Sequence, residues 1–333
     1  MKVSVVIPTY NSVATIQATL DSVLQQKVPP DEILVLDDGS TDNTVSLLDS
    51  YKPKITVFQQ KNSGVAAARN TLCERARGDL FAFLDHDDIW HSSYLEVQRR
   101  HFEDYPNAVA FFTGHVDFYG YGTYDWKQTE FDANGRIEVM DPLRFFKRHD
   151  ETPGFFGSAS FLCVPKRVLR AMDNEPFCKK VSGVDDAYLC TLLPLLGPVV
   201  YTPFPLVAYR IVKEAQSTNK LKAFELWVEV FQLLEERYQN QPDTKLSRAF
   251  RMASASKRRQ YAKRLMGAGR ASEARRQLWY SLRNSSNPSS LAKSLVLLLL
   301  THMPTLIQPK WPPGYREWKV TQSESKEDKT STA

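Results

Sequence analysis

The sequence predicts an α/β fold, a Rossmann-like and mostly parallel sheet flanked by helices, followed by an all-helical C-terminal region. Short apolar segments rich in Val and Ile alternate with helical patterns through the first hundred residues. Polar clusters stand where those apolar segments end, and beyond about residue 216 only the helical pattern remains. Strands that alternate with helices pair in parallel through right-handed crossovers, and ligands of such sheets collect at the carboxyl ends of the strands.

The N-terminal elements follow from the spacing of apolar residues, which recur every second residue in strands and every three or four in helices. The chain opens on a Val- and Ile-rich strand and then on an amphipathic helix. The expected strands are residues 2–7, 32–36, 55–58 and 80–84, and the expected helices are 12–26, 41–51 and 64–76. The clean alternation is lost beyond residue 109.

The composition is that of a folded protein with a core of its own. Of 333 residues, 42% are hydrophobic and 11% aromatic, so a large core can form without disulfides or structural metals. The four cysteines are scattered without C-x-x-C spacing, which disfavours zinc sites and disulfide frameworks. Because the chain opens directly on a strand, we expect a cytoplasmic location, with peripheral attachment to the cytoplasmic face of the membrane left open.

An acidic cluster follows the apolar run of residues 81–84, as though a buried strand delivers carboxylates to one point. Asp85 and Asp87 repel each other unless a cation joins them. Hard divalent cations such as Mn²⁺ or Mg²⁺ bind one or two carboxylates together with the phosphates of a substrate. The alternative for an isolated cluster is an Asp-rich turn that caps the next helix.

Two further polar clusters follow the first and second strands. Pro8, Thr9 and Tyr10 offer an aromatic ring and hydrogen-bonding groups, and Asp38 lies in the second cluster. An aromatic ring can stack on a base while a carboxylate accepts a hydrogen bond from a ring N–H. Each cluster alone reads equally well as a turn into a helix, but together with Asp85 they mark one rim of the sheet.

Four segments in this order, within ninety residues, resemble the family 2 glycosyltransferases, which are nucleotide-sugar enzymes with the type A glycosyltransferase fold. They are Val5-Val6-Ile7-Pro8-Thr9-Tyr10-Asn11, Val35-Leu36-Asp37-Asp38-Gly39-Ser40-Thr41-Asp42, Asn62-Ser63-Gly64-Val65-Ala66-Ala67-Ala68-Arg69-Asn70 and Phe83-Leu84-Asp85-His86-Asp87-Asp88. A lone D-x-D is a weak signal, whereas four segments with the family's order and spacing are a specific one.

The resemblance implies that Pro8, Thr9, Tyr10 and Asp38 line the nucleotide pocket, with Asp38 meeting the base. It implies a Mn²⁺ or Mg²⁺ cofactor at the diphosphate.

At this cofactor Asp87 would be the direct metal ligand. Asp85 would be a second ligand or would hold a ribose hydroxyl or a metal-bound water. His86 belongs to the same donor-binding stretch but not to the metal, because hard cations prefer oxygen. Arg69 would lie near phosphate or serve as a structural ion-pair partner, and the sequence leaves both roles open.

A second acidic pair, Asp185-Asp186, stands where the family places Glu-Asp at the start of a helix beneath the acceptor. Carried over, Asp186 would be the catalytic base, with Asp185 as the alternative because it replaces the commoner Glu. A helix N-cap is the structural alternative for either one. Val212 occupies the position of a family histidine, so metal use can differ from that of relatives.

These parts together imply an inverting, metal-dependent glycosyltransferase that uses a nucleoside-diphosphate sugar, expected to be a UDP-sugar. The acceptor would be a hydroxyl of a glycan or lipid-linked glycan in cell-surface polysaccharide synthesis. One alternative is a non-catalytic sugar-nucleotide-binding scaffold. The other is a nucleotidyltransferase, which the absence of a Gly-rich loop with Lys or Arg after the first strand disfavours.

The domain organisation expected from the pattern is a nucleotide-sugar domain over residues 1–215, a helical region over 216–310 and a partly disordered tail over 311–333. Basic residues are concentrated between 245 and 283, as a solvated face or as contacts with an anionic membrane, and we expect no nucleic-acid partner. The apolar run at 295–300 is too short to span a bilayer.

Overall fold

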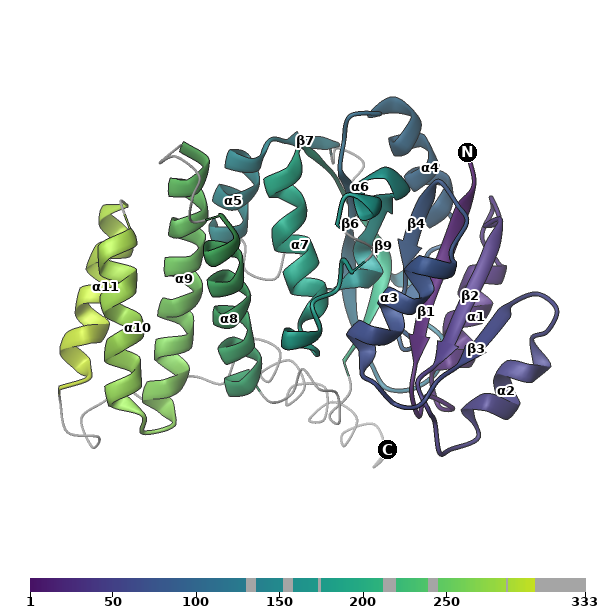
Figure 1. The fold of residues 1–333 in the computed structure, drawn as a ribbon, viewed down its shortest axis with the longest axis horizontal. Helices are drawn as coiled ribbons and strands as arrows, with labels where there is room; N and C mark the ends of the chain where they lie inside the picture. The colour runs from purple at the N-terminus through teal and green to yellow at the C-terminus, as the bar shows by residue number, and fades with distance from the viewer. Residues whose placement is uncertain are drawn as a thin grey trace. The chain divides into compact units, whose positions relative to one another are not determined.

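The computed structural model describes residues 1–129, 136–151, 158–172, 175–211, 220–238, 245–285 and 287–302. The chain divides into two compact units, Met1–Ala253 and Ser254–Ala333. Figure 1 shows the elements of both units along the chain.

The predicted alternation of the first unit is confirmed element by element, with ends that differ by a few residues. Each predicted strand and helix of the first 84 residues is present. The elements are β1 (Val3–Thr9), α1 (Ile16–Leu24), β2 (Glu32–Asp37), α2 (Thr44–Ser50), β3 (Thr56–Gln59), α3 (Val65–Arg75) and β4 (Leu80–Phe83).

The strands of the described residues form one sheet in the order β3-β2-β1-β4-β8-β6-β9-β5, with β7 paired to β9. The pairs within β3-β2-β1-β4 and the pair of β6 with β9 are parallel, whereas the other pairs are antiparallel. The predicted mostly parallel sheet is thus confirmed for its first half, and the second half is mixed. The added strands are β5 (Ile89–Trp90), β6 (Ala110–Tyr119), β7 (Glu138–Met140), β8 (Leu162–Pro165) and β9 (Val199–Ile211).

The central strand β1 is buried on both faces, because its side chains alternate between two hydrophobic clusters. Val5 and Ile7 belong to a cluster with Leu20 of α1, whereas Val6 belongs to another with Leu72 of α3. Burying each of these aliphatic side chains contributes about 1.5–3 kcal/mol. The polar residues at the end of β1 are therefore held on a rigid support.

Further helices complete the first unit. They are α4 (Tyr94–Asp104), α5 (Pro142–Glu151), α6 (Lys166–Arg170), α7 (Asp185–Leu196) and α8 (Lys220–Tyr238). Apolar residues of α8, Val230, Phe231 and Leu234, belong to the same core cluster as Leu189 of α7. The first compact unit thus extends beyond residue 215. The end of the nucleotide-sugar domain at residue 215 stays a prediction.

The predicted helical character of the C-terminal region is confirmed by α8 and three further helices, α9 (Lys245–Gly267), α10 (Ala271–Asn284) and α11 (Pro288–Leu300). The second unit begins within α9, at Ser254. Among the described residues, no helix combines the length and the apolar character that crossing a membrane requires. The predicted disordered tail over residues 311–333 lies outside the described residues.

Candidate functional site

The carboxyl ends of the adjacent parallel strands β2, β1 and β4 carry the predicted polar clusters along one edge of the sheet. Pro8 and Thr9 are the last residues of β1, and the ring of Tyr10 directly after them is 44% exposed. Asp38 follows β2, and its backbone N–H donates to the carbonyl of Thr9 at 2.8 Å. Tyr10 is thus available at this edge for stacking on a planar ligand.

The carboxylate of Asp38 shapes the loop that leads into α3. It accepts hydrogen bonds from the Gln60 side chain at 2.7 Å and from the backbone N–H groups of Ser63 and Gly64 at 2.9 and 2.8 Å. Gly64 has a φ of +87°, a conformation that strains other residues. The structure therefore shows Asp38 as the organiser of this loop, and its contact with a base stays a prediction.

Asp85 follows β4 and is held from two sides. Its side chain accepts hydrogen bonds from a guanidinium nitrogen of Arg69 and, at 3.2 Å, from the hydroxyl of Ser158. Its backbone N–H donates to the hydroxyl of Ser160 at 3.0 Å. The sequence pattern assigned no role to these two serines, which lie just after residues 152–157, a stretch outside the described residues.

Arg69 of α3 joins Asp85 to the acidic pair at the start of α7. Its second guanidinium nitrogen lies 2.6 Å from a carboxylate oxygen of Asp185, and the arginine is only 4% exposed. Of the two roles that the sequence left open, the ion pair is the one that these contacts realise. A buried charge whose partner is removed is strongly destabilising, so Arg69 holds α3, β4 and α7 together at this point.

Asp186, next to Asp185, has the electrostatic character of a base that works near neutral pH. Burial raises its pKa to about 7, the cation of Arg69 opposes this rise, and the carboxylates of Asp185 and Asp85 add to it. Its one hydrogen bond within the described residues comes from the backbone N–H of Ala187 at 2.7 Å. A carboxylate with a pKa near the working pH is suited to proton transfer.

Asp185 is committed to the fold by comparison. It is buried, bonds Arg69, and accepts a second hydrogen bond from the backbone N–H of Gly183 at 3.1 Å. Asp186 is half-buried and makes no ion pair with an arginine among the residues that the structure describes. The two acids thus differ in their contacts: Asp185 is engaged in the ion pair with Arg69, and Asp186 is not.

Asp87 and Asp88 differ in the same way. Burial, and to a smaller extent the neighbouring Asp85, raises the pKa of the half-buried Asp87. Its carboxylate accepts no hydrogen bond from the other side chains that the structure describes. Asp88 is fully buried and accepts the backbone N–H of Arg210 at 2.9 Å, and burial followed by the charges of Asp87 and Asp85 holds its pKa well above the usual range. His86, between Asp85 and Asp87, lies 3.4 Å from the hydroxyl of Thr15 through Nδ1.

The residues present fit a hard divalent cation whose coordination is completed by a bound substrate and water. Asp87 has an unengaged carboxylate, and Asp85 offers a second one beside it. Within the described ranges no group of three His, Cys, Asp or Glu residues could hold a metal by itself. Magnesium-type sites often take one or two carboxylates and fill the remaining positions with waters and substrate phosphates.

Arg210, near the end of β9, was missed by the sequence reasoning, which attended to Val212 two residues later. Its guanidinium donates to the backbone carbonyls of Asp87, Gly120 and Gly122 at 2.6, 2.5 and 2.8 Å and lies over the ring of Phe118 at 4.4 Å. It therefore joins the turn of Asp87 to the loop after β6. Val212 itself lies outside the described residues.

The loop after β6 is partly packed and partly open. Tyr124 makes edge contacts with Phe118 and Trp126, with ring centroids 5.4 and 4.9 Å apart. Tyr121 is 64% exposed. Tyr124 and Trp126 thus pack within this loop, whereas the side chain of Tyr121 is largely exposed.

Comparison with family models gives one match, "Glycosyl transferase family 2", over residues 4–164. This range runs from Ser4 in β1 to Val164 in β8, and hence contains every predicted donor-site residue.

Curated relatives match about a third of the chain. The chain is 42% identical over 114 residues to the putative teichuronic acid biosynthesis glycosyltransferase TuaG of Bacillus subtilis, a match that covers 33% of this chain and 45% of that protein. It is 43% identical over 98 residues to UDP-Glc:alpha-D-GlcNAc-diphosphoundecaprenol beta-1,3-glucosyltransferase WfgD of Escherichia coli, covering 29% and 39%. The chain thus spans less than half the length of the curated relatives it matches.

Solved structures show the same fold over most of the chain. S. aureus TarS 1-349 in complex with UDP-GlcNAc has a TM-score of 0.64 at 19% identity, covering 90% of each chain. Mannosyltransferase PcManGT from Pyrobaculum calidifontis, in complex with GDP-Man and Mn²⁺, has a TM-score of 0.60 at 20% identity, covering 97% of this chain and 84% of that one. At these identities the likeness establishes the fold.

Proposed function

Because residues 4–164 belong to glycosyl transferase family 2, we propose that this protein transfers a sugar from a nucleoside-diphosphate donor, a UDP-sugar, to a hydroxyl group of a glycan or lipid-linked glycan. The observation that carries the proposal is the placement of Asp186 beside the Arg69 ion pairs. The carboxyl group of Asp186 has a pKa of about 7 and lies near Asp85, the first residue of the acidic motif after β4.

On the donor side, Tyr10 and Asp38 would hold the base, and Asp87 with Asp85 would hold a Mn²⁺ or Mg²⁺ ion at the diphosphate. Such an ion offsets the negative charge that builds on the departing diphosphate. The unengaged carboxylate of Asp87 supports its assignment as the direct ligand, while Asp85 is already bonded to Arg69 and Ser158. The Mn²⁺ and GDP-Man bound by the structurally similar PcManGT support a metal and a sugar nucleotide here.

On the acceptor side, Asp186 would take the proton of the acceptor hydroxyl while that oxygen attacks the anomeric carbon. A new glycosidic C–O bond forms as the bond between the anomeric carbon and the diphosphate oxygen breaks, so the nucleoside diphosphate leaves with the electron pair. One displacement of this kind inverts the anomeric configuration. It requires no enzyme nucleophile, in contrast to retaining glycoside hydrolysis.

The relatives point to cell-envelope polymers as the class of product. TuaG is named for teichuronic acid biosynthesis, and WfgD for an acceptor joined to diphosphoundecaprenol. We therefore propose cell-surface polysaccharide synthesis on a lipid-linked acceptor. This would place the protein at the cytoplasmic face of the membrane.

The test is a donor screen with purified protein. Thermal stability would be measured with UDP, GDP and their sugars, with and without Mn²⁺, because a ligand that binds the native state stabilises it by mass action. We expect stabilisation by UDP-sugars that depends on metal, and release of UDP when an acceptor is supplied. Stabilisation without turnover on any supplied acceptor, equal in the native protein and in Asp186→Asn, would favour the alternative of a non-catalytic binding scaffold.

A further inference from the structure

The described part of the second unit carries charge of nearly one sign. Residues 254–302 contain ten lysines and arginines, and Glu273 is their only acidic residue. A body with this balance attracts anionic partners and repels copies of itself.

The basic run in α9 that the sequence pointed to is largely inside the structure. Lys257, Arg258 and Arg259 are each less than 10% exposed. The guanidinium of Arg258 lies over the ring of Tyr280 at 4.0 Å, and that of Arg259 bonds hydroxyls of Ser256 and Ser281. These cations stabilise the packing of α9 against α10, and they are not displayed to an external surface.

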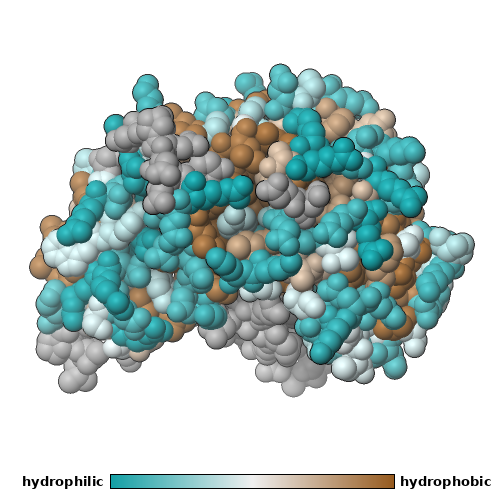
Figure 2. Space-filling view, in the orientation of Figure 1, coloured by the Kyte–Doolittle hydropathy of each residue, from teal (hydrophilic) through white to brown (hydrophobic). Residues whose placement is uncertain are grey.

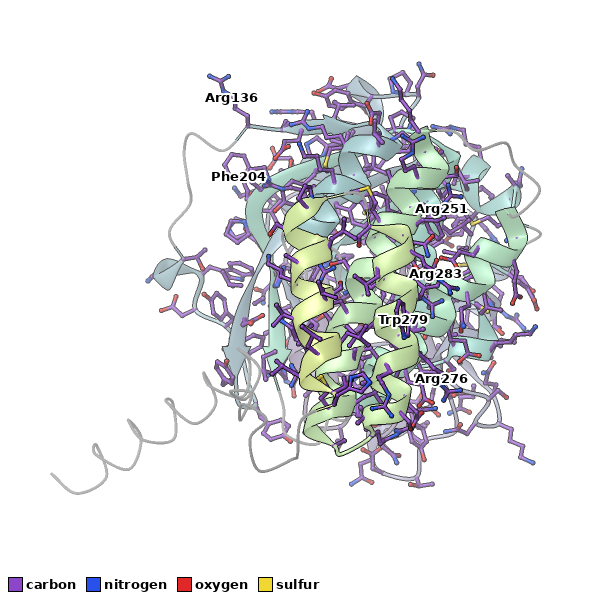
Figure 3. All side chains as sticks on the ribbon, turned by 90° about the vertical axis from the view of Figure 1, so that its left-hand side faces the viewer. Arg136, Phe204, Arg251, Arg276, Trp279 and Arg283 are labelled. Carbon is purple, nitrogen blue, oxygen red and sulfur yellow. The ribbon has the colours of Figure 1, made fainter. Side chains whose placement is uncertain are left out.

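The outward face of α10 is a stripe made of Arg276, Trp279 and Arg283, defined here as the α10 stripe. These residues are spaced by three and four positions, so they share one helical face, and Figure 3 shows them following one another along α10. Trp279 is 53% exposed. Together with Tyr280 and Asn284, the stripe lines a shallow groove.

The adjacent helix α11 displays an apolar row. Leu295, Val296 and Leu299 are 50%, 55% and 62% exposed, which is unusual for aliphatic side chains of one helix face. The opposite face of α11 packs inward through residues that include Ser294, whose hydroxyl lies 2.9 Å from that of Ser281 in α10. The two helices lie side by side in Figures 1 and 3, and Figure 2 shows apolar side chains at this end among hydrophilic ones.

We infer that the outer surface of α10 and α11 docks on an anionic lipid membrane, with α11 lying in the interface. Aliphatic side chains of an interfacial helix enter the acyl boundary, and tryptophan sits at the level of the headgroups. Each basic side chain near an anionic surface adds about 1 kcal/mol of attraction. The stripe supplies two arginines and a tryptophan, and the apolar row supplies the inserting side chains.

Other occupants fit this surface less well. A soluble anionic polymer would engage Arg276 and Arg283 but would leave the three aliphatic side chains in water. A second copy of the chain would bring two strongly basic bodies together. Of these three occupants, the lipid surface is the one that offers anionic groups and hydrocarbon at once. This assignment stands apart from the proposed sugar transfer, because it names a different surface and a different ligand.

The experiment is co-sedimentation of the full chain with vesicles of phosphatidylcholine alone or with 30% phosphatidylglycerol, a composition of about one anionic lipid in three. We expect binding only to the anionic vesicles, weakened by 0.5 M NaCl, since about 0.5 M salt screens surface charge within a few ångströms. The double variant Arg276→Glu/Arg283→Glu should lose at least about tenfold in vesicle affinity, and Leu295→Ser/Leu299→Ser a similar factor even at low salt. Circular dichroism and thermal unfolding would establish that each variant is folded.

The matched control is Lys27→Glu/Lys54→Glu, which makes the same charge change at two exposed lysines of the first unit. It should leave vesicle binding within about twofold of the native protein. Equal losses in the control and in the α10 variant would overturn the inference, as would undiminished binding by the α11 variant. Binding to soluble polygalacturonate with none to vesicles would assign the stripe to an anionic glycan and would also overturn it. UDP release on a soluble acceptor should be unchanged in these variants. Vesicle binding therefore tests the membrane surface whether or not the sugar-transfer proposal holds.

Discussion

Asp85 and Asp185 lie one hundred residues apart in the chain and bind the same guanidinium, that of Arg69. Asp85 closely follows strand β4, and Asp185 opens α7. One arginine thus fixes the distance between the motif proposed to hold the donor and the pair proposed to supply the base. A change at this arginine should affect both halves of the site.

Replacing Arg69 by methionine should destabilise the fold by about 3–5 kcal/mol, because it leaves two carboxylates in the interior without their cation. Lysine should rescue little, since one ammonium group cannot bond both acids in the planar geometry that a guanidinium offers. Urea denaturation measures the loss.

The matched control is Arg75→Met at the other end of α3, where an exposed guanidinium lies over the ring of Phe58 at 4.6 Å. That variant should cost less than about 1 kcal/mol. Similar costs for the two arginines would show that the ion pairs do not support the fold.

Asp87→Ala should abolish metal-dependent donor binding while the fold stays intact. Burial raises the pKa of Asp87, so its charge is held at a cost in the metal-free protein, and removing it should not lower the melting temperature. Mn²⁺-dependent stabilisation by UDP, measured by thermal shift, should disappear.

The control for this variant is Asp49→Ala, an exposed acid whose partner is Lys52. It should respond to UDP and Mn²⁺ as the native protein does. A metal-dependent response that persists in Asp87→Ala would move the metal to other ligands.

The rate of sugar transfer should rise with pH through a midpoint near 7. Only the ionised form of Asp186 can accept a proton, and this form predominates above its pKa of about 7. The measurement is the pH profile of UDP release with a saturating acceptor.

Asp186→Asn should retain donor binding, as measured by thermal shift, and lose transfer at every pH. Normal transfer by this variant would assign the base elsewhere, with Asp185 the next residue to test.

The same pKa predicts how Asp186 affects stability. Its value in the folded protein lies above the ordinary value of 3.8, so between pH 4 and 7 the folded state holds a proton that the unfolded state has released. The contribution of Asp186 to stability should therefore fall as the pH rises through this range. Asp186→Asn should gain stability relative to the native protein from pH 4 to pH 7 in denaturant titrations, and a constant difference would contradict the assignment.

Arg210→Lys should loosen the loop after β6 and the turn of Asp87 together. A lysine cannot reproduce the three backbone contacts of the guanidinium. We expect faster proteolysis at residues 119–125 and Mn²⁺-dependent UDP binding that is weaker by about tenfold, or about 1.4 kcal/mol.

Arg167→Lys provides the comparison, because Arg167 also donates to two backbone carbonyls, those of Pro106 and Ala108, but outside the candidate site. Its UDP affinity should not change. If Arg210→Lys kept its UDP affinity while becoming protease-sensitive, Arg210 would order the loop without supporting UDP binding.

The first four strands could be predicted because each is a short apolar run between helices, and local periodicity decides such elements. The direction of β8 could not, because an apolar run of four residues reads the same in parallel and antiparallel pairing. The position of α8 in the core of the first unit also depends on packing that no local pattern records.

At the site, the sequence identified the residue types and their order but not their mutual contacts. Arg69 was ambiguous because its partners, Asp85 and Asp185, lie 16 and 116 residues away. Arg210 stands two residues before Val212 in a family-like segment, but the sequence pattern assigned it no role, since its contacts are with backbone carbonyls that any residue provides. The basic run of α9 suggested an exposed charged surface. The burial of Arg258 and Arg259 depends on packing that the sequence does not record.

The two partners of β4 lie at very different distances along the chain, so its two pairings can form at different times during folding. Its parallel pairing with β1 is complete once the first 84 residues exist, whereas its antiparallel partner β8 begins only at Leu162. Contacts that close long loops form late because more chain entropy is lost before they are made. We expect the nascent chain to assemble the donor half of the sheet on its own, with Arg69 meeting Asp85 before Asp185 has been synthesised.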